Sequence, residues 1–272
     1  MKSEFDLLIR HAAVVDGTGA PRYEADIGIV GDRIMKIGDL SSFSAKKEID
    51  LHGKIAAPGF IDAHTHDDRM MLSDPEMTPK VSQGVTTIIG GNCGISLAPM
   101  PRPIPDPVTP PLNLLDDQGG WFKFPTFASY IAELNKQPAA TNRAMLVGHT
   151  TLRVAVMDDL EKPATKDQIS KMQEMVVEAM QAGAIGVSTG LFYEPAVAAP
   201  TQEVIDVCKP LKEFNGLYCT HMRDEADGVI DSLEEDPASP TVFSPAKLGI
   251  DDVALQAVRR AEMLADLGDR SE

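Results

Sequence analysis

The chain has 272 residues, of which 43% are hydrophobic, and this is enough apolar material for one large domain or two small ones. Its formal net charge of −16 argues against a nucleic acid as partner, because binding to a phosphate backbone depends on clusters of Lys and Arg. Three cysteines are too few for a disulfide framework and indicate a reducing compartment. The sequence contains no apolar run of about eighteen residues and no signal-peptide pattern, so we expect a soluble, cytoplasmic protein with no membrane partner.

Residues 1–57 are predicted to form part of a small β-sandwich. The apolar run over residues 5–16 is typical of a strand, and it ends in a cluster of Gly, Thr, Ala and Pro at residues 17–21. Short apolar stretches on both sides of Gly31-Asp32 indicate a tight hairpin. A further strand is expected over residues 47–51.

Residues 58–235 alternate short apolar strands with helical patterns, which is typical of βα units and a parallel sheet. Thr165 and Gln168 form a capping box at the start of the clearest helix, which Gly183 ends. We expect helices over residues 78–84, 126–136 and 165–183, and from residue 201 with an interruption at Pro210. After a first, buried strand that leads into His64, further strands are expected at residues 85–89, 144–147, 184–187 and 217–221.

The expected fold is α/β, a (β/α)8-type barrel that is incomplete. Five strands occur by residue 221, whereas a closed barrel of this type has eight. Seven prolines lie between residues 99 and 120, which predicts a long loop over the face where the strands end. Residues 236–272 are predicted to be a tail with one amphipathic helix at residues 251–267, after an acidic stretch at residues 224–236.

His64 and His66 are the first candidate metal ligands. In an extended strand, residues two apart project from the same face, so the two imidazoles can grip one ion. Asp67 and Asp68 follow directly, and carboxylates there suit a cationic site and the support of its ligands. The alternative is that this pair occurs by chance and that either ring is an ordinary surface residue.

Cys93 and His221 follow the second and fifth predicted strands, and residues at these strand ends converge on one face of a parallel βα fold. Imidazole and thiolate ligands together favour zinc, and a catalytic zinc keeps one position open for water. Cys93 has an alternative interpretation as an ordinary small residue in a glycine-rich turn. His149, also at a strand end, is either a supporting donor or a satisfied polar contact.

Five motifs together resemble the amidohydrolase superfamily, and within it the N-acyl-D-amino-acid deacylases. The resemblance covers about residues 5–233. Its specific feature is a Cys after the second strand, where dihydroorotase-like and hydantoinase-like relatives instead use a carbamylated Lys on a later strand. The motifs are found at residues 58–68, 91–94, 148–153, 188–193 and 220–223.

The resemblance implies a (β/α)8, or TIM, barrel with a zinc site. Cys93 and His221 would hold the tightly bound zinc, and His64 and His66 would serve a weaker metal position near Cys93. The implied substrate is a small molecule, an N-acyl-D-amino acid, whose amide is hydrolysed by metal-activated water. Other matching positions are implied to contact substrate or support the ligands: Asp67, His149, Tyr193 and Arg223.

Two elements of the family have no counterpart in this sequence. No His follows His221 to supply the ligand of the sixth strand, and no Asp matches the catalytic Asp of the eighth, so the catalytic residue is unknown. We therefore expect a C-terminally truncated member that is weakly active or inactive by itself. The alternatives are a non-catalytic fragment that self-associates through the open barrel edge, and a cyclic amidase, which Cys93 disfavours.

Overall fold

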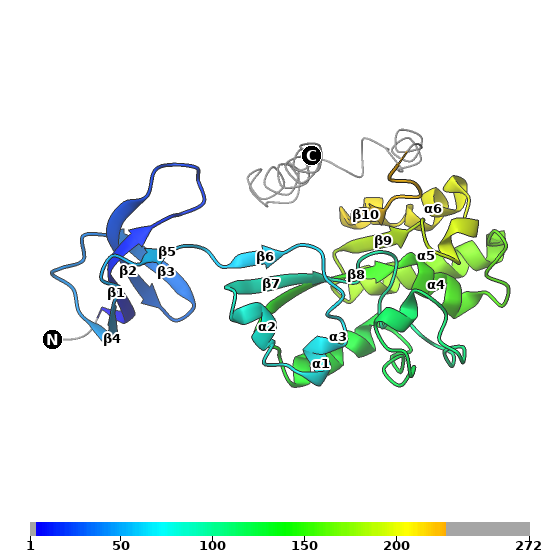
Figure 1. The fold of residues 1–272 in the computed structure, drawn as a ribbon, viewed down its shortest axis with the longest axis horizontal. Helices are drawn as coiled ribbons and strands as arrows, with labels where there is room; N and C mark the ends of the chain where they lie inside the picture. Colours follow the sequence, from blue (N-terminus) through cyan, green and yellow to red (C-terminus); the bar gives the residue numbers. More distant parts are fainter. Residues whose placement is uncertain (1–3, 227–272) are drawn as a thin grey trace, which may run out of the picture. The chain divides into compact units, whose positions relative to one another are not determined.

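The computed structural model describes residues 4–226, and the predicted tail with its helix lies outside these residues. The chain divides after Gly59 into two compact units, each with its own sheet (Figure 1). The acidic stretch at residues 224–236 lies almost entirely outside the described residues as well.

The N-terminal unit is a five-stranded sheet in the order β3-β2-β1-β4, with β5 paired to β1. Strand β1 is antiparallel to β2 and parallel to β4. Gly31 and Asp32 form the turn between β2 and β3, as the sequence predicts. The strands are β1 (Phe5–Val14), β2 (Tyr23–Val30), β3 (Arg33–Gly38), β4 (Ala45–Asp50) and β5 (Ile55–Ala56).

The second unit contains the predicted five-stranded parallel sheet, in the order β10-β9-β8-β7-β6. Consecutive strands are neighbours, so the chain advances across the sheet one strand at a time, as in part of a barrel. The strands are β6 (Phe60–Asp62), β7 (Val85–Gly90), β8 (Asn142–Gly148), β9 (Gly186–Gly190) and β10 (Leu217–His221).

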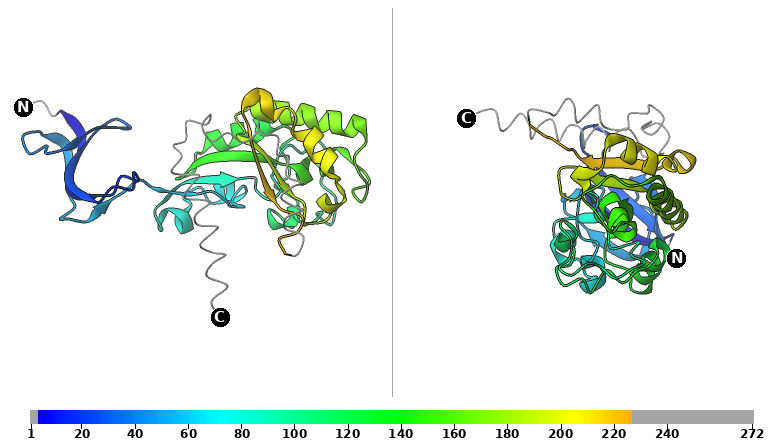
Figure 2. Two further views of the ribbon diagram at one scale, coloured as in Figure 1. Left: turned by 90° about the horizontal axis from the view of Figure 1, so that it is seen from above. Right: turned by 90° about the vertical axis from the view of Figure 1, so that its right-hand side faces the viewer.

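The helices of this unit lie outside its sheet, and α5 (Lys166–Gln181) contacts both α3 (Phe127–Lys136) and α6 (Thr201–Cys208) (Figures 1 and 2). The predicted capping box of α5 is present, because Thr165 accepts from the Gln168 amide while the Gln168 side chain accepts from the Thr165 amide. The helical elements are α1 (Met70–Ser73), α2 (Thr78–Val81), η1 (Leu112–Leu114), α3 (Phe127–Lys136), α4 (His149–Val156), α5 (Lys166–Gln181), η2 (Ala196–Ala198), α6 (Thr201–Cys208) and α7 (Leu211–Phe214).

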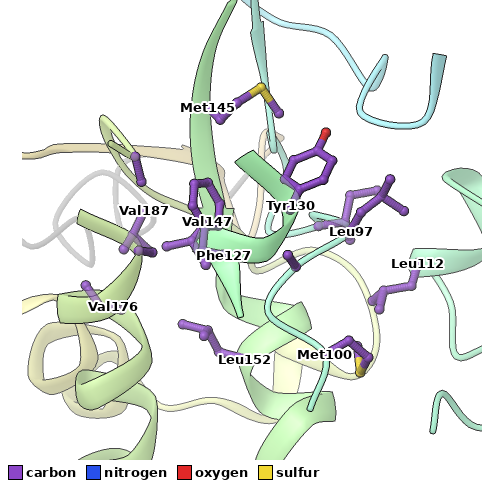
Figure 3. Packing of buried hydrophobic residues seen from close by; sticks show 14 of the residues in the cluster. Leu97, Met100, Leu112, Phe127, Tyr130, Met145, Val147, Leu152, Val176 and Val187 are labelled. Atoms are coloured by element: carbon purple, nitrogen blue, oxygen red, sulfur yellow. The ribbon is translucent and has the colours of Figure 1, made fainter. Parts of the chain in front are cut away.

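The proline-rich segment is irregular, as predicted, but it is also part of the core. Leu97, Met100 and Leu112 pack beside Phe127 and Tyr130 of α3 (Figure 3). Each of these side chains is at most 3% exposed. Apolar side chains within and beside the proline run therefore anchor this segment in the core.

Three local predictions differ from the structure. Residues 149–156 form helix α4, where no helix was predicted. Helix α2 ends at Val81, before the predicted end at residue 84. Strand β6 was predicted to be buried, yet Phe60 and Ile61 are 66% and 56% exposed, because β6 is the edge strand of its sheet.

Candidate metal centre

His64 and His66 lie just beyond β6, which ends at Asp62. The segment nevertheless stays alongside β7, because the Thr65 amide donates to the carbonyl of Ile89 at 3.2 Å. The two imidazole rings lie 5.7 Å apart, centroid to centroid, and nearly perpendicular to one another at 75°. They are therefore placed by a strand extension that follows β7 and not by a strand of their own.

Cys93 lies in a tight turn that follows β7. Its φ is +52°, a backbone conformation that costs free energy for a residue with a side chain and that clusters at functional sites. Gly91 allows the turn to press against the neighbouring strand, since a Cβ there would lie 2.0 Å from the Leu146 carbonyl oxygen. The Asn92 amide group donates to the Ile89 carbonyl at 2.8 Å and ties the turn back to β7.

The structure brings the predicted ligands together around the Cys93 thiol. The Sγ atom lies 3.0 Å from Nε2 of His64 and 4.0 Å from Nδ1 of His221, which ends β10. Within residues 4–226, ligand atoms of His64, His66 and Cys93 form one cluster in which all lie within 4.8 Å of one another. Three strand ends that are distant in sequence thus converge on one sulfur atom.

Burial shapes the electrostatics of these ligands. Burial, with a smaller contribution from the Glu225 carboxylate, raises the pKa of the Cys93 thiol to about 11. Burial and the neighbouring His64 lower the pKa of His66, which favours the neutral ring that metals bind. The Nδ1 atom of His66 is buried and has no hydrogen-bond partner. An unpaired imidazole nitrogen beside a thiol is a donor set that fits zinc.

Two aromatic side chains border His221. The Tyr193 hydroxyl lies 3.3 Å from Nδ1 of His221, and the two rings are 4.7 Å apart. The Phe192 ring lies 5.7 Å from the same imidazole, tilted by 39°, and Phe192 is 59% exposed. Burial, followed by the influence of Cys93 and Glu225, raises the pKa of Tyr193, so its hydroxyl keeps its proton and can donate. Tyr193 is therefore in contact with His221, one of the candidate ligands.

Asp67 faces Lys80, a residue that the sequence did not single out. The Lys80 ammonium lies 2.9 Å from Asp67 and 2.6 Å from Asp62, so one cation serves the carboxylates on both sides of the His64 segment. Burial opposes the charge of Lys80, but its hydrogen bonds to the two aspartates raise its pKa. Asp67 also accepts from the Thr65 hydroxyl. No sequence signal identifies Lys80, because it comes from a separate, four-residue helix.

Asp68 is fully buried behind the ligands. One of its carboxylate oxygens accepts from the Gly91 amide at 3.0 Å, and the other has no hydrogen-bond partner. Burial raises the pKa of Asp68 to about 7. The Tyr130 hydroxyl donates to the Asp68 carbonyl at 2.8 Å. Asp68 thus links the histidine segment to the turn that carries Cys93.

His149 begins α4 and is fully buried beside Glu203 of α6. Its Nε2 atom lies 3.4 Å from Glu203 Oε1, outside hydrogen-bonding geometry. Burial, with the positive charge of Arg153 adding, lowers the pKa of His149, although Glu203 opposes the shift. Arg153 holds the Glu203 carboxylate directly. The sequence left His149 as either a supporting donor or a satisfied polar contact, and it did not single out Glu203, whose helical position carries no local signal.

Arg223 lies just after β10, and its guanidinium donates to two backbone carbonyls. The acceptors are Val197 and Ala199, each at 2.9 Å. Arg223 therefore joins the end of β10 to the η2 turn that follows Tyr193. The other cysteines differ from Cys93: Cys208 is buried in α6, and the Cys219 thiol lies 3.6 Å from the Asn92 side chain.

Over residues 4–226 the structure contains no helix that is both long enough and apolar enough to cross a membrane.

The chain is similar in sequence to known members of one protein family. The profile of the Amidohydrolase family matches residues 47–246. D-aminoacylase from Alcaligenes xylosoxydans xylosoxydans is 52% identical over 231 residues, which are 85% of this chain and 47% of the relative. The chain thus spans about half the length of that curated relative.

Two solved structures are also similar to this chain. A structure of D-aminoacylase, solved to study the functional role of its binuclear metal center, has a TM-score of 0.81 and 52% identity. The match covers 85% of this chain and 48% of the D-aminoacylase chain. N-acyl-D-glutamate deacylase from Bordetella bronchiseptica, complexed with zinc and a phosphonate inhibitor, has a TM-score of 0.82 and 37% identity, over 96% of this chain and 57% of its own. The family profile matches more than half of this chain's residues, so the chain belongs to the amidohydrolase family.

Proposed function

We propose that this chain carries the metal-binding part of a zinc-dependent hydrolase that cleaves the amide bond of N-acyl-D-amino acids. The observation that carries the proposal is the convergence of His64, His66 and His221 around the Cys93 thiol. Both relatives are named for N-acyl-D-amino acids or their D-amino-acid products, and one was solved with zinc. One name specifies glutamate and the other specifies no amino-acid side chain, so the class and not one amino acid is the proposed substrate.

Four side chains would hold metal in two positions, a tightly bound zinc and a weaker one near Cys93. Cys93 follows β7 and His221 ends β10, and these two residues would bind the tight zinc through sulfur and nitrogen. His64 and His66 would serve the weaker position with two further nitrogens. When bound, zinc supplies a Lewis acid that polarises an amide carbonyl and lowers the pKa of water. The protein's own contribution is to hold these donors in place, with Cys93 buried and His64 exposed to solvent.

Neighbouring residues have proposed roles toward the substrate and the ligands. Tyr193 presents a hydroxyl beside His221, suited to donate to a carbonyl or carboxylate oxygen of the substrate. Asp67, neutralised by Lys80, keeps the histidine segment against β7. His149 and Arg223 support the site through α4 and the η2 turn, respectively.

Zinc content tests the proposal directly. Purified chain, dialysed against zinc and then against buffer, is expected to retain about one zinc per chain, and Cys93→Ala is expected to lose it, since no other thiol in the described residues joins the cluster. Cys208→Ala is the matched control, because that thiol lies in α6. Equal zinc retention in both variants would contradict the assignment.

Hydrolysis is measured on the same samples with N-acetyl-D-methionine and its L enantiomer. Release of D-methionine that depends on zinc and on Cys93 supports the proposed reaction. Zinc binding without release under any condition would leave the metal site standing and count against hydrolysis by residues 1–272 alone.

A further inference from the structure

We propose that Ser188 is a positioning residue for Cys93, and this inference rests on the metal site of the proposed function. Ser188 lies in β9 and is fully buried. Its hydroxyl accepts from the Gly94 amide at 2.9 Å and donates to the Gly91 carbonyl. One hydroxyl group thus clamps both sides of the turn that carries Cys93.

The turn needs such a clamp because its backbone conformation is energetically unfavourable. Gly91, Cys93 and Gly94 all have positive φ, at +77°, +52° and +75°. Cys93 is the member of this set with a side chain, so relaxation of the turn toward ordinary φ values would lower its backbone energy. The bond from the Ile95 amide to the Asn92 carbonyl closes the turn from inside, and Ser188 holds it from outside.

Ser188 is a rigid anchor because β9 is paired on both sides. Ser188 lies opposite Gly148 of β8 and opposite Cys219 of β10. His221 follows two residues after Cys219 on the same strand. The clamp therefore fixes the Cys93 turn relative to the strand that delivers His221, and metal affinity depends steeply on such ligand geometry.

Cobalt(II) is the probe, since a thiolate bound to cobalt gives a near-ultraviolet charge-transfer band that reports on the metal–sulfur bond itself. We expect wild-type chain to show this band and Ser188→Ala to bind cobalt about 10- to 100-fold more weakly, with a weaker or shifted band. The variant removes one oxygen and introduces no clash, and circular dichroism checks that it folds.

Ser96→Ala is the matched control. Ser96 is also fully buried, and its hydroxyl also spans two backbone groups, donating to Ala98 at 2.7 Å and accepting from Gly148 at 3.0 Å. Both alanine variants are expected to lower the melting temperature, but only Ser188→Ala is expected to change cobalt affinity and the band. An equal loss of affinity in both would overturn the proposal, because it would reflect general destabilisation.

Ser188→Thr provides a second test that does not depend on the alanine variant. It keeps the hydroxyl and is expected to retain cobalt binding close to that of the wild type. Binding as weak as that of Ser188→Ala would overturn the proposal, since side-chain volume and not the hydroxyl would then matter. A wild-type chain without any thiolate band would instead reject the metal site, and the positioning role with it.

Discussion

Lys80 lies between two carboxylates, Asp62 and Asp67, that flank the His64 segment. Its side chain is 21% exposed, so the ion pairs are partly shielded from water. Replacing Lys80 by Met leaves both carboxylates without their cation. We expect a loss of about 1–2 kcal/mol in the free energy of unfolding of the metal-free chain, measured by urea denaturation.

Lys136→Met is the matched control for this variant. Lys136 pairs with Glu133 on the surface of α3, with the two side chains 72% and 38% exposed. Water screens such a pair, so we expect little change. If both Met variants lowered stability equally, the Lys80 network would have no special role in holding the histidine segment.

At the scale of elements, α4 and α6 meet through a buried charged network. Arg153 of α4 holds Glu203 of α6, and it also donates to the carbonyls of Leu160 and Lys162 at 2.8 Å. His149 shares this interior and its pKa is lowered by burial. Because Arg153 already supplies the positive charge, a second cation on His149 would not be compensated.

This network predicts a dependence of stability on pH. The ordinary pKa of the His149 ring is 6.5, and the folded value is lower, so the unfolded chain takes up the proton first as the pH falls. The stabilisation is thus present above pH 6.5 and is lost as the pH falls through the folded pKa. We expect His149→Gln to reduce this loss, measured by urea unfolding of the metal-free chain across this range.

His52→Gln is the control for the removal of an imidazole. Its ring is 81% exposed in the N-terminal unit. If both glutamine variants reduced the pH dependence equally, burial of His149 would not be its cause.

Helices α4 and α5 show why one element was predictable and the other was not. Helix α5 has a capping box and an apolar stripe, which are local features of its own residues. Helix α4 has no side-chain cap, and seven of its eight residues are buried, so its sequence shows no alternation of an apolar face with a solvent-exposed one. Its Thr and Val residues also have weak helix propensity. Packing on both sides, not local preference, makes this segment helical.

At the scale of the whole molecule, all four candidate ligands belong to the second unit. Zinc that binds only the folded state stabilises that state by mass action, by about 2.7 kcal/mol at a hundredfold excess over the dissociation constant. We expect zinc to slow hydrogen exchange most at residues 64–66, 91–94 and 217–221. Mass spectrometry measures this, with the β2–β3 hairpin as reference, and a uniform effect on both regions would contradict a local site.

The sequence by itself determined the order of the strands and the candidate metal ligands. Alternation of apolar strands with capped helices predicts a parallel sheet. In a parallel sheet, His64, Cys93 and His221 all lie at the carboxyl ends of the strands, on one face of the fold. The β6 strand was misjudged, because an apolar composition does not say whether a strand lies at the edge of its sheet. Edge position depends on which strands pair, and this is a property of the assembled sheet.

Only the tertiary structure decided how these ligands are held. Ser188, Lys80 and Glu203 have ordinary sequence surroundings, and each acts on residues between 13 and 97 positions away. Their hydrogen bonds and ion pairs form only when separate strands and helices meet, so no local pattern can reveal them. A metal ligand can be predicted from its residue type and strand position, whereas the groups that orient it depend on the geometry of contacts between distant segments.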